Sequence, residues 1–453
     1  MLIRNIYRTI GLGTACAVLG ACGGDSGGSG GNPQPATNAP PVFEATTAIS
    51  VPENEVLVAP VLFSDPEGGK LTYSLTSSTG VEGNFLVDEE GRLLFAEPAD
   101  FERPAGVGGA ELTNEYRFTV SATDPLGATT SRDITVTVTD LTGADDQRYV
   151  DEIFGGVGLV ENVQFGVAPR PGGRTEDLFM NIYLPPSIDT ETRRPVILLA
   201  FPGGFIQGDR DDVANLAFRF ALRGYVAATV DYRIAEQLPA SELDYLKLAA
   251  DAVQDVSAAV RFFREDGLTD NTYGVDPNLI FVGGESAGAV IAATLATLEI
   301  DDLEPGSPIR TYLEETGGIA GRSSDNADTI SSDIQGALSI SGGVLDLAFI
   351  DSGSRPLFVA HHTGDTITPC ETGPEGLQNS GVILSGGCAI SARYQALGLE
   401  FGKLIVQGPG HVNFSPLDTF RIFNGASELF YRDVIAPSIS RRVEDETGVV
   451  MIK

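Results

Sequence analysis

Residues 284–288, Gly-Glu-Ser-Ala-Gly, place a serine in a glycine-flanked turn between a strand-like run and a helix-like run. The apolar run at 280–282 precedes this turn, and a helical pattern begins at Ala287. The glycines let a strand and a helix approach closely, while the turn forces the Ser286 hydroxyl to project outward. This strand–turn–helix context requires an α/β layered fold, which the surrounding sequence has to supply.

The alternation of strand-like and helix-like patterns across 150–440 supplies such a fold. Continuous apolar runs indicate strands buried on both faces, and apolar side chains that recur every three or four residues indicate amphipathic helices. We therefore predict an α/β fold in which helices cover a mostly parallel sheet. Strands are expected at 195–201, 225–230, 280–282, 337–341, 356–360 and 403–406, and helices at 211–223, at 246–265 and from 287 onward.

A nucleophilic serine needs a base, and the base needs an acid to orient it. The sequence contains only three His, so the candidates for the base are few. His411 follows the last expected strand and Asp365 follows the one before it, at the carboxyl ends where this architecture places its sites. We predict that Ser286, Asp365 and His411 form a catalytic triad in this chain order, with Asp346 as the alternative acid.

Glycines near two expected strand ends are candidates for stabilising an oxyanion. Residues 202–205, Pro-Gly-Gly-Phe, follow the strand at 195–201, and glycines there can present bare backbone N–H groups to a substrate. The N–H group of the residue after the serine can complete the set. We predict an oxyanion hole formed by Gly203, Gly204 and Ala287.

Together these residues resemble the α/β-hydrolase carboxylesterases, including the hormone-sensitive-lipase-like and feruloyl-esterase-like branches. The resemblance implies an α/β-hydrolase domain over 150–440 that hydrolyses small-molecule or polymeric esters through an acyl-enzyme, with no cofactor for catalysis. The usual His-Gly-Gly-Gly-Phe loop of these enzymes reads Phe-Pro-Gly-Gly-Phe here, at 201–205. The matching segments are 180–185, 201–208, 231–233, 273–278 and 284–288, followed by Asp365 and His411.

Two other functions fit the same residues. One is a serine peptidase on the same fold, and the other is a surface adhesion or binding protein whose hydrolase body is inactive. A complete triad argues against the inactive body, because a decayed site should have lost a member. Residues 299–335, with many Gly, Ser, Asp and Asn, are interpreted either as a lid near the pocket or as a plain surface loop.

Residues 42–140 have the pattern of an all-β module. Apolar and polar side chains alternate at 71–75, 116–120 and 134–139, which is typical of half-buried strands. The segments Asp-Pro-Glu-Gly at 65–68 and Asp-Pro-Leu-Gly at 124–127 have turn chemistry. About 100 residues of short strands favour a β-sandwich.

This module resembles a cadherin-like repeat. The matching pieces include Ala-Pro-Pro-Val-Phe at 39–43, Val-Pro-Glu-Asn-Glu at 51–55 and Val-Thr-Val-Thr-Asp at 136–140. The resemblance implies carboxylates that could ligate Ca²⁺, which prefers six to eight oxygen ligands. The alternative is a spacer sandwich with solvated acids. The implied calcium ligands are Glu53, Glu102, Asp124 and Asp140.

The amino terminus has the pattern of a processing signal. Arg4 and Arg8 precede an apolar run that ends in Leu-Gly-Ala-Cys at 19–22, and the run is too short to span a bilayer. It resembles a bacterial lipoprotein signal, which implies removal of 1–21 and lipidation of Cys22. The Gly, Ser, Asn and Pro of 22–41 predict a flexible linker. We expect an exported protein, held in the membrane by its lipid, at the outer membrane because Gly follows the cysteine.

Composition excludes some partners and suggests one cross-link. The formal net charge of −33 argues against nucleic-acid binding, because phosphate backbones need a basic surface. Cys370 and Cys388 remain after processing, and in an exported chain they predict a disulfide, with two buried thiols as the alternative. His361 and His362 are interpreted as structural or pocket-lining, and no cluster has the spacing of a metal site for catalysis.

Overall fold

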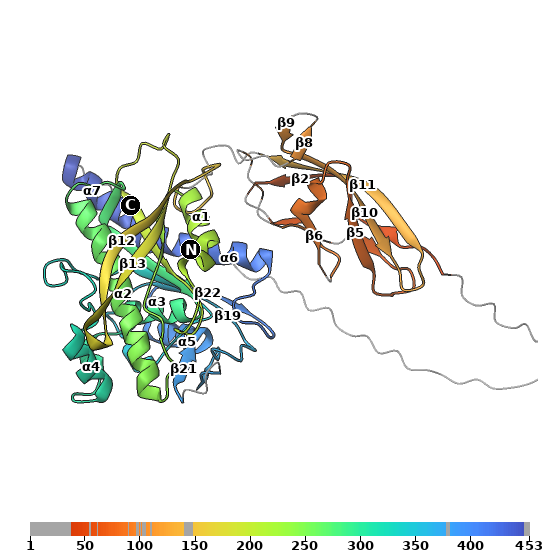
Figure 1. Ribbon diagram of the computed structural model, residues 1–453. Helices are drawn as coiled ribbons and strands as arrows, with labels where there is room; N and C mark the ends of the chain where they lie inside the picture. The colour runs from red at the N-terminus through yellow and green to blue at the C-terminus, as the bar shows by residue number, and fades with distance from the viewer. Residues whose placement is uncertain are drawn as a thin grey trace, which may run out of the picture.

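A computed structural model of the protein has two bodies (Figure 1). Each body has a hydrophobic core of its own. The expected signal peptide at 1–21, Cys22 and most of the 22–41 linker lie outside the residues that the structure describes. The structure describes 38–447 except for gaps at 54–55, 61, 89, 97–98, 100, 102–105, 109–110, 140–147 and 377–380, and without the side chains of 106–108, 111–112 and 442–447.

The amino-terminal body, residues 38–139, is an all-β sandwich, as predicted. Alternate side chains of its long strand at 115–123 are buried, which follows from the period-2 pattern. Phe85 and Phe118 join the two sheets, with ring centroids 4.4 Å apart. One sheet has the order β2 (Ala48–Pro52), β11 (Thr129–Thr139), β10 (Glu115–Thr123), β5 (Thr72–Thr76), and the other β3 (Leu57–Ala59), β7 (Leu93–Phe95), β6 (Phe85–Val87); short pairs join β1 (Val42–Phe43) to β4 (Phe63–Ser64) and β8 (Gly106–Gly108) to β9 (Glu111–Thr113).

The carboxyl-terminal body is built on one eight-stranded sheet. Its first two pairings are antiparallel, and the remaining five are parallel, so six neighbouring strands run in the same direction. This mostly parallel sheet confirms the predicted α/β-hydrolase fold. The strand order is β12 (Gly158–Arg170), β13 (Arg174–Leu184), β15 (Val226–Val230), β14 (Arg194–Ala200), β16 (Val275–Glu285), β17 (Gly336–Ile340), β19 (Leu357–His362), β22 (Phe401–Val406).

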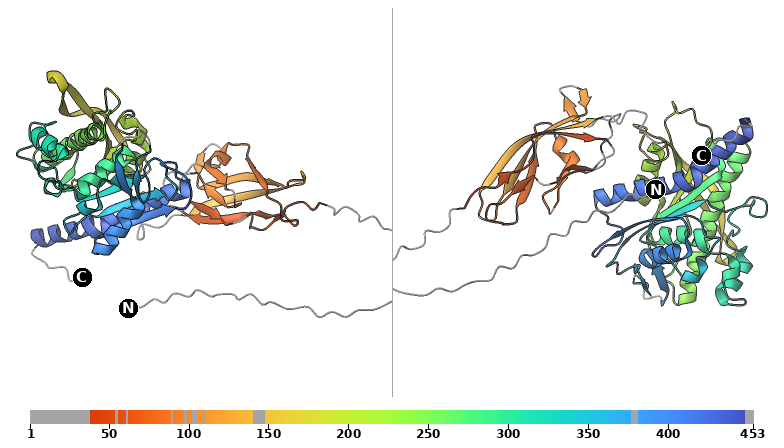
Figure 2. Two further views of the ribbon diagram at one scale, coloured as in Figure 1. Left: turned by 90° about the horizontal axis from the view of Figure 1, so that it is seen from below. Right: turned by 180° about the vertical axis from the view of Figure 1, so that it is seen from behind.

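Helices cover both faces of this sheet (Figure 2). Helices α2 and α3 pack together on one face, whereas α1 and α6 meet on the other, where the rings of Phe220 and Phe423 lie 5.5 Å apart. Helix α5 lies beside β22 and supports a small sheet of order β18-β21-β20. The helices are α1 (Ala214–Leu222), α2 (Glu242–Leu268), α3 (Ala287–Thr297), α4 (Pro308–Thr316), α5 (Gly387–Leu397), α6 (Pro416–Phe430) and α7 (Ala436–Thr447), and the small strands are β18 (Gly343–Val344), β20 (Thr372–Pro374) and β21 (Ile383–Gly386).

The 299–335 segment packs along α2. Tyr312 Oη donates to Asp251 Oδ1 at 2.7 Å, and Gln254 Nε2 donates to Thr316 Oγ1 at 2.8 Å. The preceding helix α3 begins at Ala287 and, at about 1.5 Å per residue, carries the chain roughly 16 Å away from Ser286 before the segment starts. These contacts place the described part of the segment against α2, which covers one face of the sheet.

Candidate active site

Ser286 occupies a strained turn between β16 and α3. Its φ of 51° and ψ of −113° lie in a region that residues with side chains rarely adopt. The flanking glycines are required by space, because an added Cβ would lie 2.0 Å from Ala200 O at Gly288 and 2.5 Å from the same oxygen at Gly284. Ser286 N also donates to Ile340 O of β17 at 2.9 Å, so the turn is fixed to two neighbouring strands.

The structure brings the three predicted triad residues into one hydrogen-bonded chain. His411 Nε2 lies 2.7 Å from Ser286 Oγ, and His411 Nδ1 lies 2.7 Å from Asp365 Oδ2. Each residue follows a strand of the parallel part of the sheet, namely β16, β19 and β22. Because parallel strands share a carboxyl edge, side chains far apart in the sequence meet there. This is the geometry of a serine, its base and an orienting acid.

The carboxylate of Asp365 is held by several donors. Its Oδ1 accepts from the backbone N–H groups of Ile367 at 2.8 Å and Thr368 at 3.1 Å. Burial alone would raise the pKa of Asp365, but hydrogen bonds from His361 and His411 outweigh it and hold the pKa well below its usual value. Asp365 is therefore ionised at neutral pH and can stabilise positive charge on His411.

Asp346, the alternative acid, lies at the start of a different turn from the one that carries Asp365. Its Oδ1 accepts from Ala348 N at 2.8 Å, so it caps a short helical turn at Leu347–Phe349. Asp365, and not Asp346, is the carboxylate in contact with His411.

A cavity of about 580 Å³ opens beside Ser286. Gly203 and Gly204 lie in its wall, in a loop so tight that an added Cβ at Gly203 would be 2.1 Å from Gln207 O. Ala287 begins α3, where the first N–H groups have no acceptor inside the helix. The structure thus places the three predicted oxyanion residues around or next to the nucleophile. The cavity lining is Pro202, Gly203, Gly204, Gln207, Gly208, Asp212, Ser286, Ile367 and His411.

Tyr232 supports this loop, which sequence reasoning did not anticipate. Its ring stacks on Phe201 with centroids 4.0 Å apart, and its hydroxyl donates to Phe201 O at 2.8 Å. Phe201 stands where the esterases that the sequence resembles have His, and an aromatic stack anchors the loop at this position. The segment Asp-Tyr-Arg at 231–233 matched those esterases, which was the available signal for a role near the site.

Two further carboxylates lie near the nucleophile. Asp212 lines the cavity, and Glu285 directly precedes Ser286. Burial, and then the negative charge of Asp212, raises the pKa of Glu285 to about 7. Glu285 is therefore only partly ionised at neutral pH. Nothing in the local sequence indicates this, because Asp212 comes from a distant segment.

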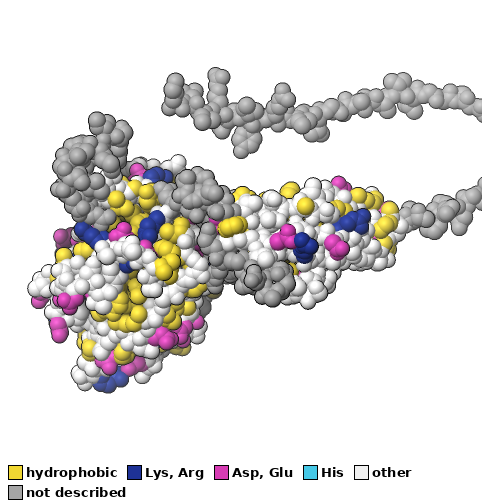
Figure 3. Space-filling model, turned by 90° about the horizontal axis from the view of Figure 1, so that it is seen from above, with side chains coloured by type: hydrophobic (Ala, Val, Ile, Leu, Met, Phe, Trp, Pro, Cys, Tyr) yellow, Lys and Arg dark blue, Asp and Glu magenta, His cyan; other side chains and the backbone are white. Residues whose placement is uncertain are grey.

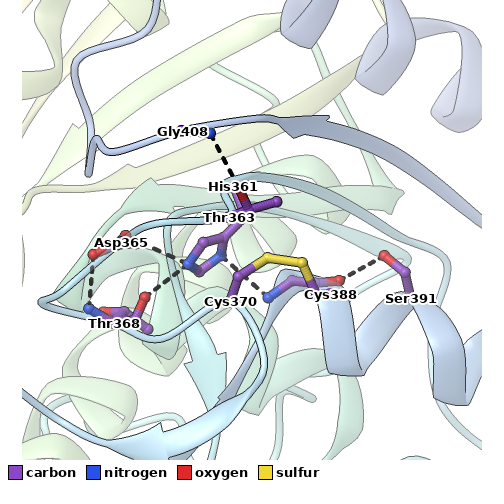
Figure 4. Close-up of a disulfide and its surroundings, with 9 residues drawn as sticks. His361, Thr363, Asp365, Thr368, Cys370, Cys388, Ser391 and Gly408 are labelled. Carbon is purple, nitrogen blue, oxygen red and sulfur yellow. Dashed lines mark hydrogen bonds and ion pairs between the residues drawn. A yellow bond between two sulfur atoms is a disulfide. The ribbon is translucent and has the colours of Figure 1, made fainter.

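The predicted cysteine pair is bonded in the structure (Figure 4). The bond joins Cys370, in the segment that follows Asp365, to Cys388 in the first turn of α5, and Cys388 N donates to Cys370 O at 2.9 Å. Beside it lies the buried ring of His361. His362 packs on Phe414, with ring centroids 4.3 Å apart, so both residues are packed inside the protein.

Two of the four implied calcium ligands are described, and their carboxylates contact local groups. Glu53 Oε2 accepts from Phe101 N at 2.9 Å, and Asp124 Oδ1 accepts from Leu126 N at 2.8 Å, as in a capped turn. Glu102 and Asp140 lie outside the described residues. Within the described part of the chain, no group of three or more His, Cys, Asp or Glu is arranged to hold a metal. Calcium binding stays a prediction.

The charge on the surface and the apolar character of the helices are relevant to two partners considered from the sequence, nucleic acid and the membrane. On the face drawn in Figure 3, Lys and Arg side chains form small separate groups rather than one continuous basic surface. Among the described helices, none combines the length and the apolar character needed to cross a membrane.

The fold and site define an α/β hydrolase with a Ser-His-Asp arrangement, and comparisons with known proteins agree with this class. Residues 180–312 match the BD-FAE family model, which confirms the predicted resemblance to esterases of this fold. The matched stretch contains the 202–208 loop and Ser286 but ends before Asp365 and His411. Residues 38–139 match the model of a bacterial Ig domain, which shares the sandwich architecture with cadherin repeats.

Individual proteins resemble shorter parts of the chain. Esterase LipI of Mycobacterium tuberculosis is 34% identical over 116 residues, which are 25% of this chain and 32% of LipI. The probable isoprenylcysteine alpha-carbonyl methylesterase ICME of Oryza sativa subsp. japonica is 36% identical over 135 residues, which are 30% of this chain and 28% of ICME. The matches thus span about a third of these relatives.

A solved structure resembles the chain over a longer stretch at lower identity. Esterase 2 of Thermogutta terrifontis, phosphonylated by cyclosarin, is 20% identical, with 63% of this chain and 97% of that one covered and a TM-score of 0.44.

Proposed function

We propose that this protein is a carboxylesterase that hydrolyses esters through an acyl-enzyme. The observation that carries the proposal is the chain of two 2.7 Å contacts from Ser286 Oγ through the His411 ring to Asp365. The esterase names of the similar proteins favour an ester over an amide as substrate. Asp212 lines the cavity and contributes a carboxylate to its wall.

The acylation step follows from this geometry. Ser286 Oγ bonds to the ester carbonyl carbon as its proton passes to His411 Nε2, and the carbonyl oxygen becomes an oxyanion. N–H groups of Gly203, Gly204 and Ala287 stabilise that oxygen, with each donor worth about 3–4 kcal/mol. The C–O bond to the alcohol then breaks, and His411 gives its proton to the leaving oxygen.

Deacylation repeats the sequence with water. His411 takes a proton from the water as its oxygen bonds to the acyl carbon, and collapse of the second tetrahedral species breaks the bond to Ser286. His411 returns the proton to Oγ, and the acid leaves. Asp365 stays ionised throughout and stabilises the protonated His411.

Substitution of the nucleophile tests this proposal. In Ser286→Ala, hydrolysis of a short-chain p-nitrophenyl ester should fall to background while the circular dichroism spectrum stays unchanged, and a fluorophosphonate probe should no longer label the chain. Ser187→Ala, at an exposed serine, is the matched control and should keep both activity and labelling. Full ester hydrolysis by Ser286→Ala would refute the proposal. Cleavage of an amide but not of the matched ester would favour a peptidase.

We also propose that the enzyme is exported and held at the cell envelope by a lipid on Cys22. The support is the sequence Leu-Gly-Ala-Cys at 19–22, which follows a short apolar run. Cell fractionation should place the wild-type chain in the membrane fraction and Cys22→Ala in the soluble exported or precursor fractions. Equal distribution of the two would contradict the anchor.

A further inference from the structure

His361 is a buried histidine beside the triad that the proposed chemistry does not use. It lies at the end of β19, four residues before Asp365, and only 1% of its surface is exposed. Its ring fits between the segment that carries Asp365 and the start of α5 (Figure 4). A buried imidazole with contacts at both ring nitrogens is fixed in orientation, so its protonation state can be derived from its partners.

Those partners assign the tautomer of His361. The backbone N–H of Gly387, the first residue of α5, donates to Nδ1 at 3.1 Å. A backbone N–H can only donate, so Nδ1 carries the lone pair and the ring proton sits on Nε2. The contact also satisfies an N–H group at the helix start that has no acceptor inside the helix.

The Nε2–H group faces two acceptors. Thr368 O lies 2.8 Å away, and Asp365 Oδ2 lies 3.4 Å away. The same Oδ2 accepts from His411 Nδ1 at 2.7 Å. One carboxylate oxygen therefore lies between two imidazoles, one that contacts the nucleophile and one that is anchored in the core.

The disulfide fixes the distance between the two anchors of His361. Thr368 precedes Cys370 by two residues, and Gly387 immediately precedes Cys388. The bond between the two sulfurs, together with the hydrogen bond from Cys388 N to Cys370 O, joins the segments that hold the opposite ends of the ring. The ring thus cannot tilt away from Asp365 without moving both segments.

We propose that His361 is a positioning residue for catalysis, which orients the Asp365 carboxylate toward His411 through its Nε2–H group. This inference rests on the proposed esterase function and deepens it. The competing role is packing alone, in which the ring fills space between β19 and α5. The two roles differ in one respect, because only positioning acts through Asp365.

Two substitutions test the roles of the two ring nitrogens of His361 separately. His361→Gln keeps a donor that reaches the place of Nε2, whereas His361→Asn keeps an acceptor at the place of Nδ1 and loses the donor. With sites counted by fluorophosphonate titration of the full chain, we expect kcat for a p-nitrophenyl ester to fall roughly 10-fold or more in His361→Asn. KM should change less than about twofold, and His361→Gln should keep most of the wild-type kcat.

A double-mutant cycle distinguishes positioning from packing, because only positioning couples His361 to Asp365. If His361 acts through Asp365, His361→Asn should lower kcat in the wild type but have no further effect in Asp365→Asn. An equal loss in both backgrounds, or equal losses in His361→Asn and His361→Gln, would overturn the inference, as would wild-type kcat in His361→Asn. Full activity of Ser286→Ala would instead defeat the proposed function itself.

A measurement on the unaltered ring covers the case in which His361→Asn does not fold. The chain has only three His, so ¹⁵N-histidine labelling gives few signals. His362→Asn and His411→Asn assign the His361 signals by elimination. We expect an Nε2–H tautomer whose proton resonance shifts upfield in Asp365→Asn. An Nδ1–H tautomer, or no shift, would overturn the inference.

Discussion

The carboxylate of Asp365 joins the two halves of the site, since two backbone N–H groups hold one oxygen and His411 contacts the other. In Asp365→Asn the amide can no longer stabilise a positive charge on His411, and it favours the wrong tautomer of the ring. We expect kcat to fall about 10³–10⁴-fold with little change in KM. Steady-state kinetics on a short-chain ester measures both.

Asp346→Asn is the matched control for this substitution. Asp346 precedes the short turn that it caps and follows β18 of the small β18-β21-β20 sheet. Asn keeps a side-chain oxygen that can accept the capping hydrogen bond from Ala348 N, so both stability and kcat should stay near their wild-type values. A large loss of kcat in Asp346→Asn, with activity kept in Asp365→Asn, would reverse the assignment of the acid.

Glu285 makes the stability of the protein depend on pH. Its pKa is raised from 4.5 to about 7 by burial and by Asp212, so between these values the unfolded chain has lost a proton that the folded chain keeps. The folded protein is therefore not destabilised by Glu285 below pH 4.5, and its free energy of unfolding falls as the pH rises from 4.5 to about 7. Glu285→Gln removes the loss, so its stability relative to wild type should rise by about 2 kcal/mol between pH 5 and pH 8.

Urea unfolding of both chains at the two pH values measures this difference, because effects of all other groups cancel when the variant is compared with wild type. Parallel pH dependence in the two chains would contradict the shift.

At the residue scale, sequence reasoning located the groups with strong local signals. Ser286 stands in a motif, and with three His in the chain the base was nearly determined by its place after a strand. The environment of Glu285, the stacking of Tyr232 and the contacts of His361 depend on segments that meet only in the folded sheet. No local pattern encodes such contacts.

At the scale of elements, the turn at Ser286 depends on close packing of β16, α3 and β14. A Cβ on Gly288 would lie 2.0 Å from Ala200 O, in the backbone of a central strand that cannot move without disturbing both neighbours. Gly288→Ala should therefore lower the unfolding free energy by about 3 kcal/mol or more, and ester hydrolysis should fall with it.

Gly156→Ala is the matched control, because no atom lies within 4 Å of its added Cβ. Its unfolding midpoint should stay close to that of wild type in urea titration. If both variants unfolded at the wild-type urea concentration, the packing described for the turn would be wrong.

The elements that were predicted are those with a clear apolar pattern. The expected strands at 195–201 and 337–341 correspond to β14 and β17 within one residue at each end, because burial on both faces leaves a continuous apolar run. The hairpin of β12 and β13 was not predicted. Its outer strand lies at the sheet edge with mostly exposed side chains, including Leu159 and Val167, so neither a continuous run nor clean alternation marks it.

At the scale of the whole molecule, the two hydrophobic cores have no residue in common. One core contains side chains from Val51 to Val138, and the other begins at Tyr149. The change from a period-2 pattern to alternating strands and helices was enough to predict this division from the sequence. Bodies with separate cores are expected to fold as separate cooperative units.

A chain reduced to residues 148–453 tests this independence. The triad and every residue that lines the cavity lie within that range, so kcat and KM for a small soluble ester should stay within about twofold of the full chain. Calorimetry should show two unfolding transitions for the full chain, and the shortened chain should keep only the one at which hydrolysis is lost. A raised KM would mean that the sandwich contributes to substrate binding, and a single shared transition in the full chain would mean that the two cores unfold together. If the expected result is obtained, the sandwich takes no part in the hydrolysis of a small soluble ester, because the triad and the cavity are complete without it.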